Sequence, residues 1–396
     1  MKFLLLLTLA VVASASLAPF YDAGRNGVKG RYIVVLQDGV DIDMTVKGLM
    51  ARVARSGSFA SIKRKIQLIN AFVSVVPEGG LDILRSLPGV AYVEEDEIIT
   101  ADGNRATSLW GLDRIDQRDT AGDDIINING YIAFTGTGSG AHVYVIDSGI
   151  YTSHEDFGGR AITGSGYDFI GGSGEDCNGH GTHCAGTVAG SVHGVAPGAK
   201  VYGLRTLNCN GSGYKSDSIE ALGWVAANGD KPGVVSMSLG GSKSDAQNTA
   251  VKNCRDAGYI VVVSAGNDDD DACLKSPASA PEAITVGATD INDQRSYFSN
   301  YGTCVDIFAP GSSIESCGIS YPTQSTIKSG TSMSCPHVAG IAAVMAANKY
   351  VSDSQYTKEV VEEIYASIIS NGTKDKITDC KDGPINKTPN LLAYCD

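Results

Sequence analysis

From residue 141 onward, short apolar runs alternate with helical stretches, and this alternation limits the possible folds more than any other feature of the sequence. Runs that are apolar at nearly every position indicate strands buried on both faces. We expect such strands at residues 141–146, 200–204, 233–238 and 259–264, with helices at 218–227 and 245–257. Buried strands that alternate with helices predict an α/β fold with a mostly parallel central sheet and helices on both faces.

The N-terminus has the layout of a secretory signal peptide. Lys2 precedes an apolar segment from Phe3 to Val12, and Ala13-Ser14-Ala15 supplies the small residues of a cleavage site. We therefore expect residues 1–15 to be removed and the protein to be secreted into the extracellular space. No later apolar run reaches the length that spans a bilayer, so no membrane attachment is expected.

Residues 31 to about 100 predict a separate, small α+β unit. Strands are expected at 31–36, 69–76 and 90–93, a helix over 43–66 that Gly57 could break, and a short helix over 80–87 that Pro88 stops. The unit contains neither cysteine nor histidine, which leaves the reactive side chains to the rest of the chain. Residues 101–108 are small and polar, as expected of a linker that a protease can reach.

The composition and the net charge exclude two further classes of protein. Hydrophobic residues make up 43% of the chain and charged residues 19%, which is typical of a globular protein and not of a disordered one. The net charge of -13 leaves no basic surplus to neutralise phosphates, so no nucleic-acid partner is expected.

Three segments rich in small residues carry an aspartate, a histidine and a serine in that order: VIDSG at 145–149, GHGTHCAGT at 179–187 and SGTSMSCPHVAG at 329–340. A serine hydroxyl is a poor nucleophile at neutral pH. It needs a base within hydrogen-bond reach, and that base needs an orienting carboxylate. The three segments therefore predict a nucleophilic site made of Asp147, His180 and Ser332.

In these motifs and their order the chain resembles the subtilisin-like serine proteases, and in particular the proteinase K branch. The resemblance covers the chain from about Trp110 to the C-terminus, while residues 31 to 100 resemble the inhibitory propeptide of the family. With the signal peptide at 1–15, it implies a propeptide at 16–105 and a subtilisin-like peptidase domain at 106–396. It further implies a monomeric serine endopeptidase of broad specificity that acts on polypeptide substrates through an acyl-enzyme.

The same resemblance implies a zymogen. The prosegment is expected to help the distant parallel strands to pair, to inhibit the enzyme as an intramolecular partner, and to leave its last strand in the substrate groove. Self-cleavage is then expected between about Thr100 and Ala106.

Carried over by motif, Asp147 is the orienting acid, His180 the general base and Ser332 the nucleophile, while His183 is structural. Zinc ligation by His180 and His183 is the alternative, since a helix would bring both near one face. A zinc site needs a third protein ligand, however, and the serine motif removes the need for a metal. The side-chain amide of Asn267 and the backbone N–H of Ser332 are implied as the two donors to the oxyanion.

Three further segments resemble those that hold the peptide substrate in the family. A protease that accepts many sequences recognises backbone, and an extended edge does so by adding the substrate as a strand. The walls carry no charge, so we expect an apolar or aromatic preference at the residue before the cut. The residues are Gly211, Ser212, Gly213, Ser238, Leu239, Gly240, Ser264, Ala265 and Gly266.

Ten cysteines lie between Cys177 and Cys395, and in an oxidising compartment most of them can pair. The resemblance implies disulfides between Cys177 and Cys209 and between Cys273 and Cys304, and it implies that Cys184 stays free beneath the histidine. Cys380 and Cys395 could tie down the C-terminal tail. Pairing stays open for Cys184, Cys254, Cys317, Cys335, Cys380 and Cys395.

The resemblance also implies a structural calcium ion, bound by the carbonyls of Pro281 and Ala283 and the carboxylate of Asp306. Such oxygen ligands suit calcium. Among the Asn-X-Ser/Thr sequences, Asn371 is the expected position of a glycan where the host attaches one.

Three rival classes are less well supported by the sequence. A peptide-binding pseudoenzyme would not need all four chemical positions, which are present here. An α/β-hydrolase requires G-x-S-x-G with the serine first in chain order, whereas this chain has Gly330-Thr-Ser-Met-Ser334 and the serine comes last. A structural protein held together by disulfides would have no use for a buried polar triad.

Overall fold

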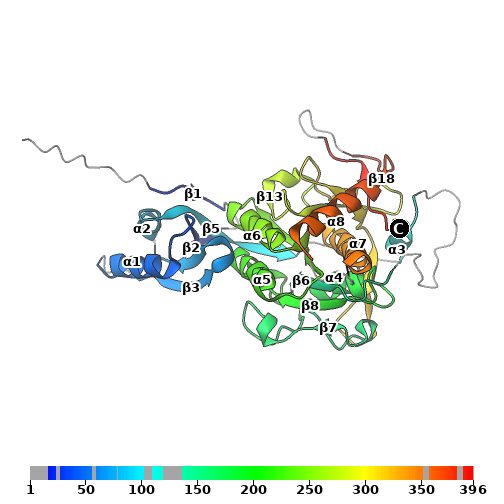
Figure 1. Cartoon of the computed structure of the whole chain (residues 1–396), viewed down its shortest axis with the longest axis horizontal. Helices are drawn as coiled ribbons and strands as arrows, with labels where there is room; N and C mark the ends of the chain where they lie inside the picture. Colours follow the sequence, from blue (N-terminus) through cyan, green and yellow to red (C-terminus); the bar gives the residue numbers. More distant parts are fainter. Residues whose placement is uncertain are drawn as a thin grey trace, which may run out of the picture.

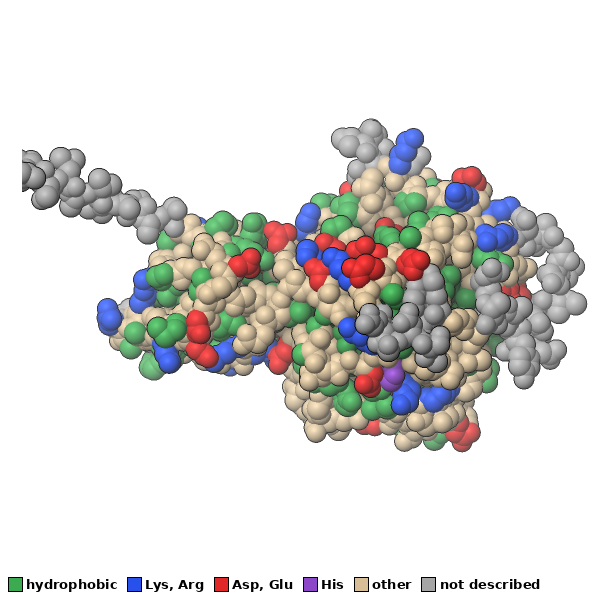
Figure 2. Space-filling model, viewed as in Figure 1, with side chains coloured by type: hydrophobic (Ala, Val, Ile, Leu, Met, Phe, Trp, Pro, Cys, Tyr) green, Lys and Arg blue, Asp and Glu red, His purple; other side chains and the backbone are tan. Residues whose placement is uncertain are grey.

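The computed structural model describes residues 17–23, 27–55, 59–77, 79–101, 109–118, 136–350, 356–380 and 387–395. The predicted signal peptide and residues 102–108 of the linker predicted at 101–108 lie outside these residues, while Ala101 belongs to a strand. Figure 1 shows a small N-terminal unit beside a larger unit built on a central sheet. On the face shown in Figure 2, acidic side chains lie interspersed with basic ones.

The central sheet of the larger unit has nine strands, and all neighbouring pairs are parallel except β18 with β19. This confirms the predicted α/β fold with a mostly parallel sheet. In spatial order the strands are β18 (Thr373–Lys374), β19 (Leu391–Leu392), β15 (Ile307–Pro310), β14 (Ile284–Thr289), β12 (Tyr259–Ser264), β10 (Gly233–Met237), β6 (His142–Asp147), β8 (Lys200–Arg205) and β7 (Ala161–Ile162).

Helices cover both faces of this sheet, because alternate side chains along each strand point to opposite sides. In β6, Val143 and Val145 join one core with α4 (His180–Ala189), α7 (Thr331–Tyr350) and α8 (Lys358–Asn371). Tyr144 and Ile146 join the other core with α5 (Lys215–Asn228) and α6 (Asp245–Asp256). In the described part of the chain, no helix combines the length and apolarity needed to cross a membrane.

The N-terminal unit is an antiparallel sheet with two helices on one face. Its strands lie in the order β5 (Val90–Ala101), β2 (Gly27–Leu36), β4 (Ala71–Val75) and β3 (Ser61–Ile66), and the short β1 (Phe20–Tyr21) pairs with β5. The helices α1 (Ile42–Arg55) and α2 (Gly80–Arg85) close a small core of their own. The opposite face contributes Val35, Ile69 and Val73 to the core beneath α5 and α6, so the two units share buried apolar surface.

Two sequence predictions in this unit were wrong. The helix expected over 43–66 ends at Arg55, and residues 61–66 form the edge strand β3, which pairs with β4. Lysine and arginine favour helices weakly, and this preference yields to an alternating strand pattern that a neighbouring strand can pair with. The strand expected at 90–93 continues to Ala101, because its C-terminal half finds partners in the larger unit.

Strand β5 connects the two units. Beyond its own sheet, Ile99 pairs with Gly213 of β9 (Ser212–Tyr214), and Ala101 pairs with Leu239 of β11 (Leu239–Ser242). Both pairings are antiparallel, and β11 pairs in turn with β13 (Lys275–Ser276). A single sheet of eight strands therefore runs from the N-terminal unit into the larger one.

Candidate active site

Asp147 and His180 form a buried pair at the carboxyl end of the central sheet. Asp147 is the last residue of β6, and His180 is the first residue of α4. The Nδ1 atom of His180 lies 2.8 Å from Oδ1 and 2.9 Å from Oδ2 of Asp147. The backbone N–H of Ser148 also donates to Oδ1 of Asp147, at 2.7 Å. These contacts fix the imidazole with Nδ1 toward the carboxylate and leave Nε2 for chemistry.

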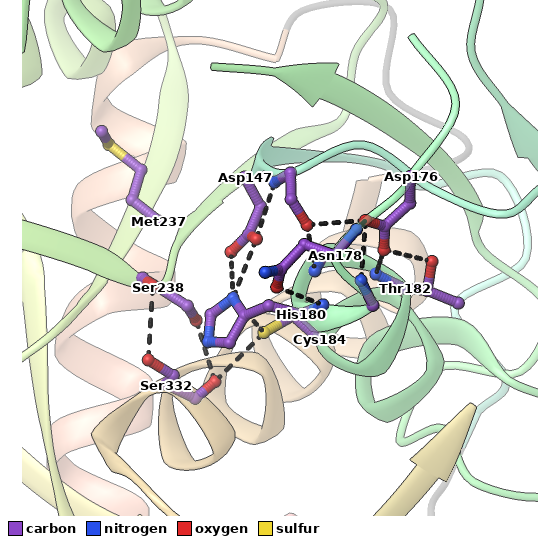
Figure 3. Close-up of polar contacts among 12 residues, drawn as sticks. Asp147, Asp176, Asn178, His180, Thr182, Cys184, Met237, Ser238 and Ser332 are labelled. Carbon is purple, nitrogen blue, oxygen red and sulfur yellow. Dashed lines mark hydrogen bonds and ion pairs between the residues drawn. The ribbon is translucent and has the colours of Figure 1, made fainter. Parts of the chain in front are cut away.

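Ser332 faces this pair from the first turn of α7. Figure 3 shows the imidazole ring of His180 between the carboxylate of Asp147 and Ser332. The Oγ of Ser332 donates to the carbonyl of Ser238 at 3.3 Å, and the Oγ of Ser238 donates to the carbonyl of Ser332 at 2.9 Å. The structure thus brings together the acid, the base and the nucleophile that the motifs indicated, from three segments far apart in the sequence.

The surroundings of His180 stabilise its protonated form. Burial alone would lower the pKa of His180, but the charge of Asp147 and the hydrogen bond to it outweigh burial and raise the pKa well above its usual value. The Sγ of Cys184 lies 3.9 Å from Nδ1 of His180 and donates to the carbonyl of Ser332 at 3.4 Å. Burial raises the pKa of this thiol, so Cys184 packs beneath the ring as a neutral group.

His183 takes no part in this site. Its Nε2 donates to the carbonyl of Ile314 at 3.0 Å, and the side chain is fully buried. Burial lowers the pKa of His183 well below the usual value, so the ring is neutral. Neither of the two clusters of His, Cys, Asp and Glu side chains found among the described residues combines His180 with His183, so the zinc alternative gains no support.

Asp176, which the sequence analysis missed, holds the start of α4. Its Oδ1 accepts from the hydroxyl of Ser148 and from the N–H groups of Asn178 and Gly179, each at 2.9 Å. Its Oδ2 accepts from the N–H of Thr182 at 2.9 Å. A carboxylate here stabilises the N-terminus of the helix and so places the first residue, His180. The available signal was an aspartate just before GHGTH, where a helix that carries both histidines would begin.

Asn267 lies after β12 with its amide oriented by Thr331. Its Oδ1 accepts from the backbone N–H and the hydroxyl of Thr331, at 2.8 and 3.0 Å. Since a backbone N–H can only donate, the atom facing it is oxygen, and the NH₂ group points the other way. Thr331 directly precedes Ser332, so these hydrogen bonds hold the amide beside the first turn of α7.

Asn300 fixes the loop around Asn267 and was also missed. Its buried amide donates to the carbonyl of Ala265 at 2.8 Å and accepts from the N–H groups of Asp268 and Asp270, each at 3.0 Å. Gly266 has φ +99°, and a Cβ there would lie 2.5 Å from Nδ2 of Asn300. Only glycine allows this loop to close over the asparagine.

The predicted peptide-binding segments line both sides of β5. Gly211, Ser212 and Gly213 lie at β9, and Leu239 and Gly240 begin β11, with Ser238 immediately before it. Thr100 of β5 pairs with Ser212 on one side and with Gly240 on the other. The third segment, Ser264 to Gly266, ends β12 and leads to Asn267.

Both predicted disulfides are present. Cys177 is bonded to Cys209, and Cys273 to Cys304. The first bond joins the segment before His180 to the loop before β9, and the second braces the loop after Asn267. Cys184, Cys254, Cys317 and Cys335 are free and buried.

The calcium residues expected from the resemblance lie together beside β14. The carboxylate of Asp306 accepts from the N–H of Thr285 at 2.8 Å and from the hydroxyl of Tyr365 at 2.7 Å. Burial raises the pKa of Asp306, so a bound cation would stabilise the charged form of this carboxylate. Together with the carbonyls of Pro281 and Ala283 this is an all-oxygen ligand set, and the residues fit a calcium ion.

Comparisons with known proteins agree with this geometry. The sequence profile of the subtilase family, peptidase S8, matches residues 138–382. The chain is 46% identical over 388 residues to an extracellular serine proteinase of Thermus sp. (strain Rt41A), covering 93% of this chain and 90% of the relative. It is 38% identical over 393 residues to a cuticle-degrading serine protease of Arthrobotrys oligospora, covering 94% and 92%.

A solved structure supports the same assignment. The crystal structure of a cold-adapted subtilisin-like serine proteinase matches with a TM-score of 0.65 and 41% identity, over 74% of this chain and 98% of that one. The profile match, the identity along nearly the whole chain and the positions of Asp147, His180 and Ser332 lead to one conclusion: the chain belongs to the subtilase family of serine endopeptidases.

Proposed function

We propose that this subtilase is made as a secreted zymogen, cleaves off its own N-terminal unit, and then hydrolyses polypeptides of many sequences outside the cell. One observation carries the proposal: residues 98–101 of the chain already lie between β9 and β11, as an added strand. An extended peptide held by backbone pairing on both sides is the pose expected of a protease substrate.

The direction of β5 leads the chain to the nucleophile. Ala101 pairs with Leu239, and the preceding Ser238 accepts the hydrogen bond of the Ser332 hydroxyl. The bond that is cut therefore lies in the next few residues, between about Thr100 and Ala106. The propeptide then comprises residues 16–105, and the peptidase domain residues 106–396.

The N-terminal unit also has the contacts of an inhibitor. Oε1 of Glu94 accepts from the N–H of Ala246 at 2.8 Å, at the N-terminus of α6. Oδ1 of Asp96 accepts from the N–H of Ser216 at 3.2 Å, at the N-terminus of α5. Carboxylates are favoured at helix N-termini, so two acidic side chains of β5 hold the unit in place on either side of the groove.

The chemistry follows from the triad. Nε2 of His180 takes the proton from Oγ of Ser332, and Oγ attacks the carbonyl carbon of the scissile bond. The N–H of Ser332 and the amide of Asn267 stabilise the oxyanion. His180 then gives the proton to the leaving amine, and the acyl-enzyme is hydrolysed by water that His180 deprotonates in the same way.

The wall segments support an apolar or aromatic preference at the residue before the cut. Ala265 is fully buried, and none of the nine predicted wall residues has a charged side chain. Peptide substrates that differ only at this residue test the preference: kcat/KM is expected to be highest for Phe and lowest for Asp. Equal values for both would contradict it.

N-terminal sequencing tests the zymogen. Wild-type secreted protein is expected to begin between residues 101 and 107, and the Ser332→Ala chain to begin at Ser16. Ser334→Ala is the matched control, because Ser334 lies on the same helix but donates to the carbonyl of Ala309. A wild-type protein that begins at Ser16 would contradict self-cleavage.

Calcium at Pro281, Ala283 and Asp306 belongs to the same proposal. A bound ion would supply a structural link between the segment before β14 and Asp306. Calcium added to protein first freed of metals is then expected to raise the melting temperature of the wild type but hardly that of Asp306→Asn. An equal shift in both would contradict the site.

A further inference from the structure

A second group of metal-ligand side chains lies at the opposite end of α4 from His180. It consists of Asp156, in the 3₁₀ turn Glu155–Phe157; His193, in the loop after α4; and Cys317, the last residue of β16 (Ile314–Cys317). One potential ligand atom from each lies within 4.8 Å of the other two. None of these residues takes part in the chemistry described above.

The three side chains meet at a single carboxylate oxygen. Nδ1 of His193 lies 2.8 Å from Oδ2 of Asp156, and Sγ of Cys317 donates to the same oxygen at 3.4 Å. The other oxygen, Oδ1, accepts from the N–H of Val192 at 2.7 Å, which fixes the carboxylate. The side chains of Asp156 and His193 are 6% and 11% exposed, and Cys317 is fully buried.

We propose that Asp156, His193 and Cys317 bind a divalent transition-metal ion, with zinc the best fit. Carboxylate, imidazole and thiolate are the ligands that zinc takes in proteins. Ligand atoms around a tetrahedral zinc ion lie about 3.5 Å apart, so the present separations need only small shifts. Three protein ligands leave a fourth position for water.

The local backbone favours a cation at this place. Helix α4 ends at Ala189, so the site lies at the C-terminal, negative end of its dipole. Gly190 follows directly, and a Cβ there would lie 2.2 Å from Oδ2 of Asp156. Arg160 brings a competing positive charge, but its guanidinium is held by the carbonyls of Asp156, Ala189 and Ala199 and the hydroxyl of Ser191.

Binding changes the protonation of two ligands. The thiol proton of Cys317 goes to solvent, and His193 coordinates through Nδ1 with its proton on Nε2. The ion replaces the two protons that now bridge these side chains to Asp156. The anionic ligands, one carboxylate and one thiolate, then balance the two charges of the metal.

The test uses the full chain with Ser332→Ala, which cannot digest itself. Cobalt(II) is titrated into the metal-free protein with both disulfides intact, because a cobalt–thiolate bond gives a charge-transfer band in the near ultraviolet. We expect one equivalent to bind with this band, and zinc to displace it and raise the melting temperature. Cys317→Ser is expected to abolish the band, and His193→Gln to weaken binding by more than about 100-fold.

Cys184→Ser is the matched control, since Cys184 lies near Asp147 and His180 in a similar cluster. A band that survives in Cys317→Ser but is lost in Cys184→Ser would place the metal at the catalytic centre and overturn the proposal. Absence of any thiolate band in the parent chain would overturn it as well. Melting curves in EDTA show whether each variant is folded; if Cys317→Ser is not, the His193→Gln result decides.

Discussion

The two ends of α4 carry the same three kinds of side chain but differ in what faces them. At the N-terminal end, Asp147 and His180 form the ion pair, and the thiol of Cys184, 3.9 Å from Nδ1 of His180, donates to the carbonyl of Ser332. At the C-terminal end, the thiol of Cys317 joins His193 on the same carboxylate oxygen of Asp156. At the N-terminal end, Nε2 of His180 remains available to a serine. At the C-terminal end, the imidazole and the thiol both contact Oδ2 of Asp156.

This comparison teaches that the composition of a cluster does not determine its chemistry. The direction of the thiol and the presence of a fourth group decide it. The helix adds to the difference, since its N-terminal end favours the carboxylate of Asp176 and its C-terminal end favours a cation.

The largest expected effect separates the two histidines. His180→Gln removes the general base and is expected to lower kcat about a million-fold. His193→Gln, the same substitution at the other end of the helix, is expected to lower kcat by less than about tenfold, because it alters only a structural contact. Steady-state kinetics on one peptide substrate measure both. Similar losses of kcat in the two variants would contradict the different roles assigned to the two histidines.

The next effect concerns the oxyanion. Asn267→Ala removes one of the two donors and is expected to lower kcat about 100- to 1,000-fold with little change in KM, because the hydrogen bond forms only in the transition state. Asn300→Ala serves as the contrast: it leaves the N–H groups of Asp268 and Asp270 without their buried acceptor. It is therefore expected to lower the free energy of unfolding by about 2 kcal/mol.

The pH dependence of the reaction is a smaller effect. His180 must be neutral to accept a proton, and its pKa is raised above the ordinary value of 6.5. Activity is therefore lost as the pH falls through the raised pKa. The acid limb of the kcat/KM profile is expected above pH 6.5. A limb below pH 6.5 would contradict this assignment.

The smallest effect is on the N-terminus of α4. Asp176→Ala removes the acceptor of several N–H groups and is expected to lower the free energy of unfolding by about 2 kcal/mol. Asp176→Asn keeps one acceptor oxygen and is expected to lose less. Urea unfolding of both variants measures the difference, and equal losses would show that the charge matters more than the acceptor.

The sequence predicted the parts of the molecule that depend on local pattern. The strand expected at 141–146 and the helices expected at 218–227 and 245–257 follow from the local apolar pattern, and the structure has them. The edge strand at 61–66 was missed because its exposed, basic side chains do not distinguish a strand from a helix without the neighbouring β4.

The contacts that join distant segments could not be predicted. Asp156, His193 and Cys317 are separated by 37 to 161 positions along the chain, and no local pattern links them. The same holds for Asn300, whose role depends on the path of a loop some thirty residues earlier. Long-range packing fixes these positions.

Strand β5 belongs both to the sheet of the N-terminal unit and to the edge formed by β9 and β11. Cutting the chain after β5 would therefore not by itself empty the space between β9 and β11. If the chain is severed beyond Ala101, the pairings with β9 and β11 and the shared core beneath α5 and α6 are all still in place. What changes is the effective concentration: a tethered segment becomes an ordinary diffusible ligand whose occupancy falls on dilution. The onset of activity would then depend on how fast the severed N-terminal unit dissociates, or on how soon another molecule of the enzyme degrades it.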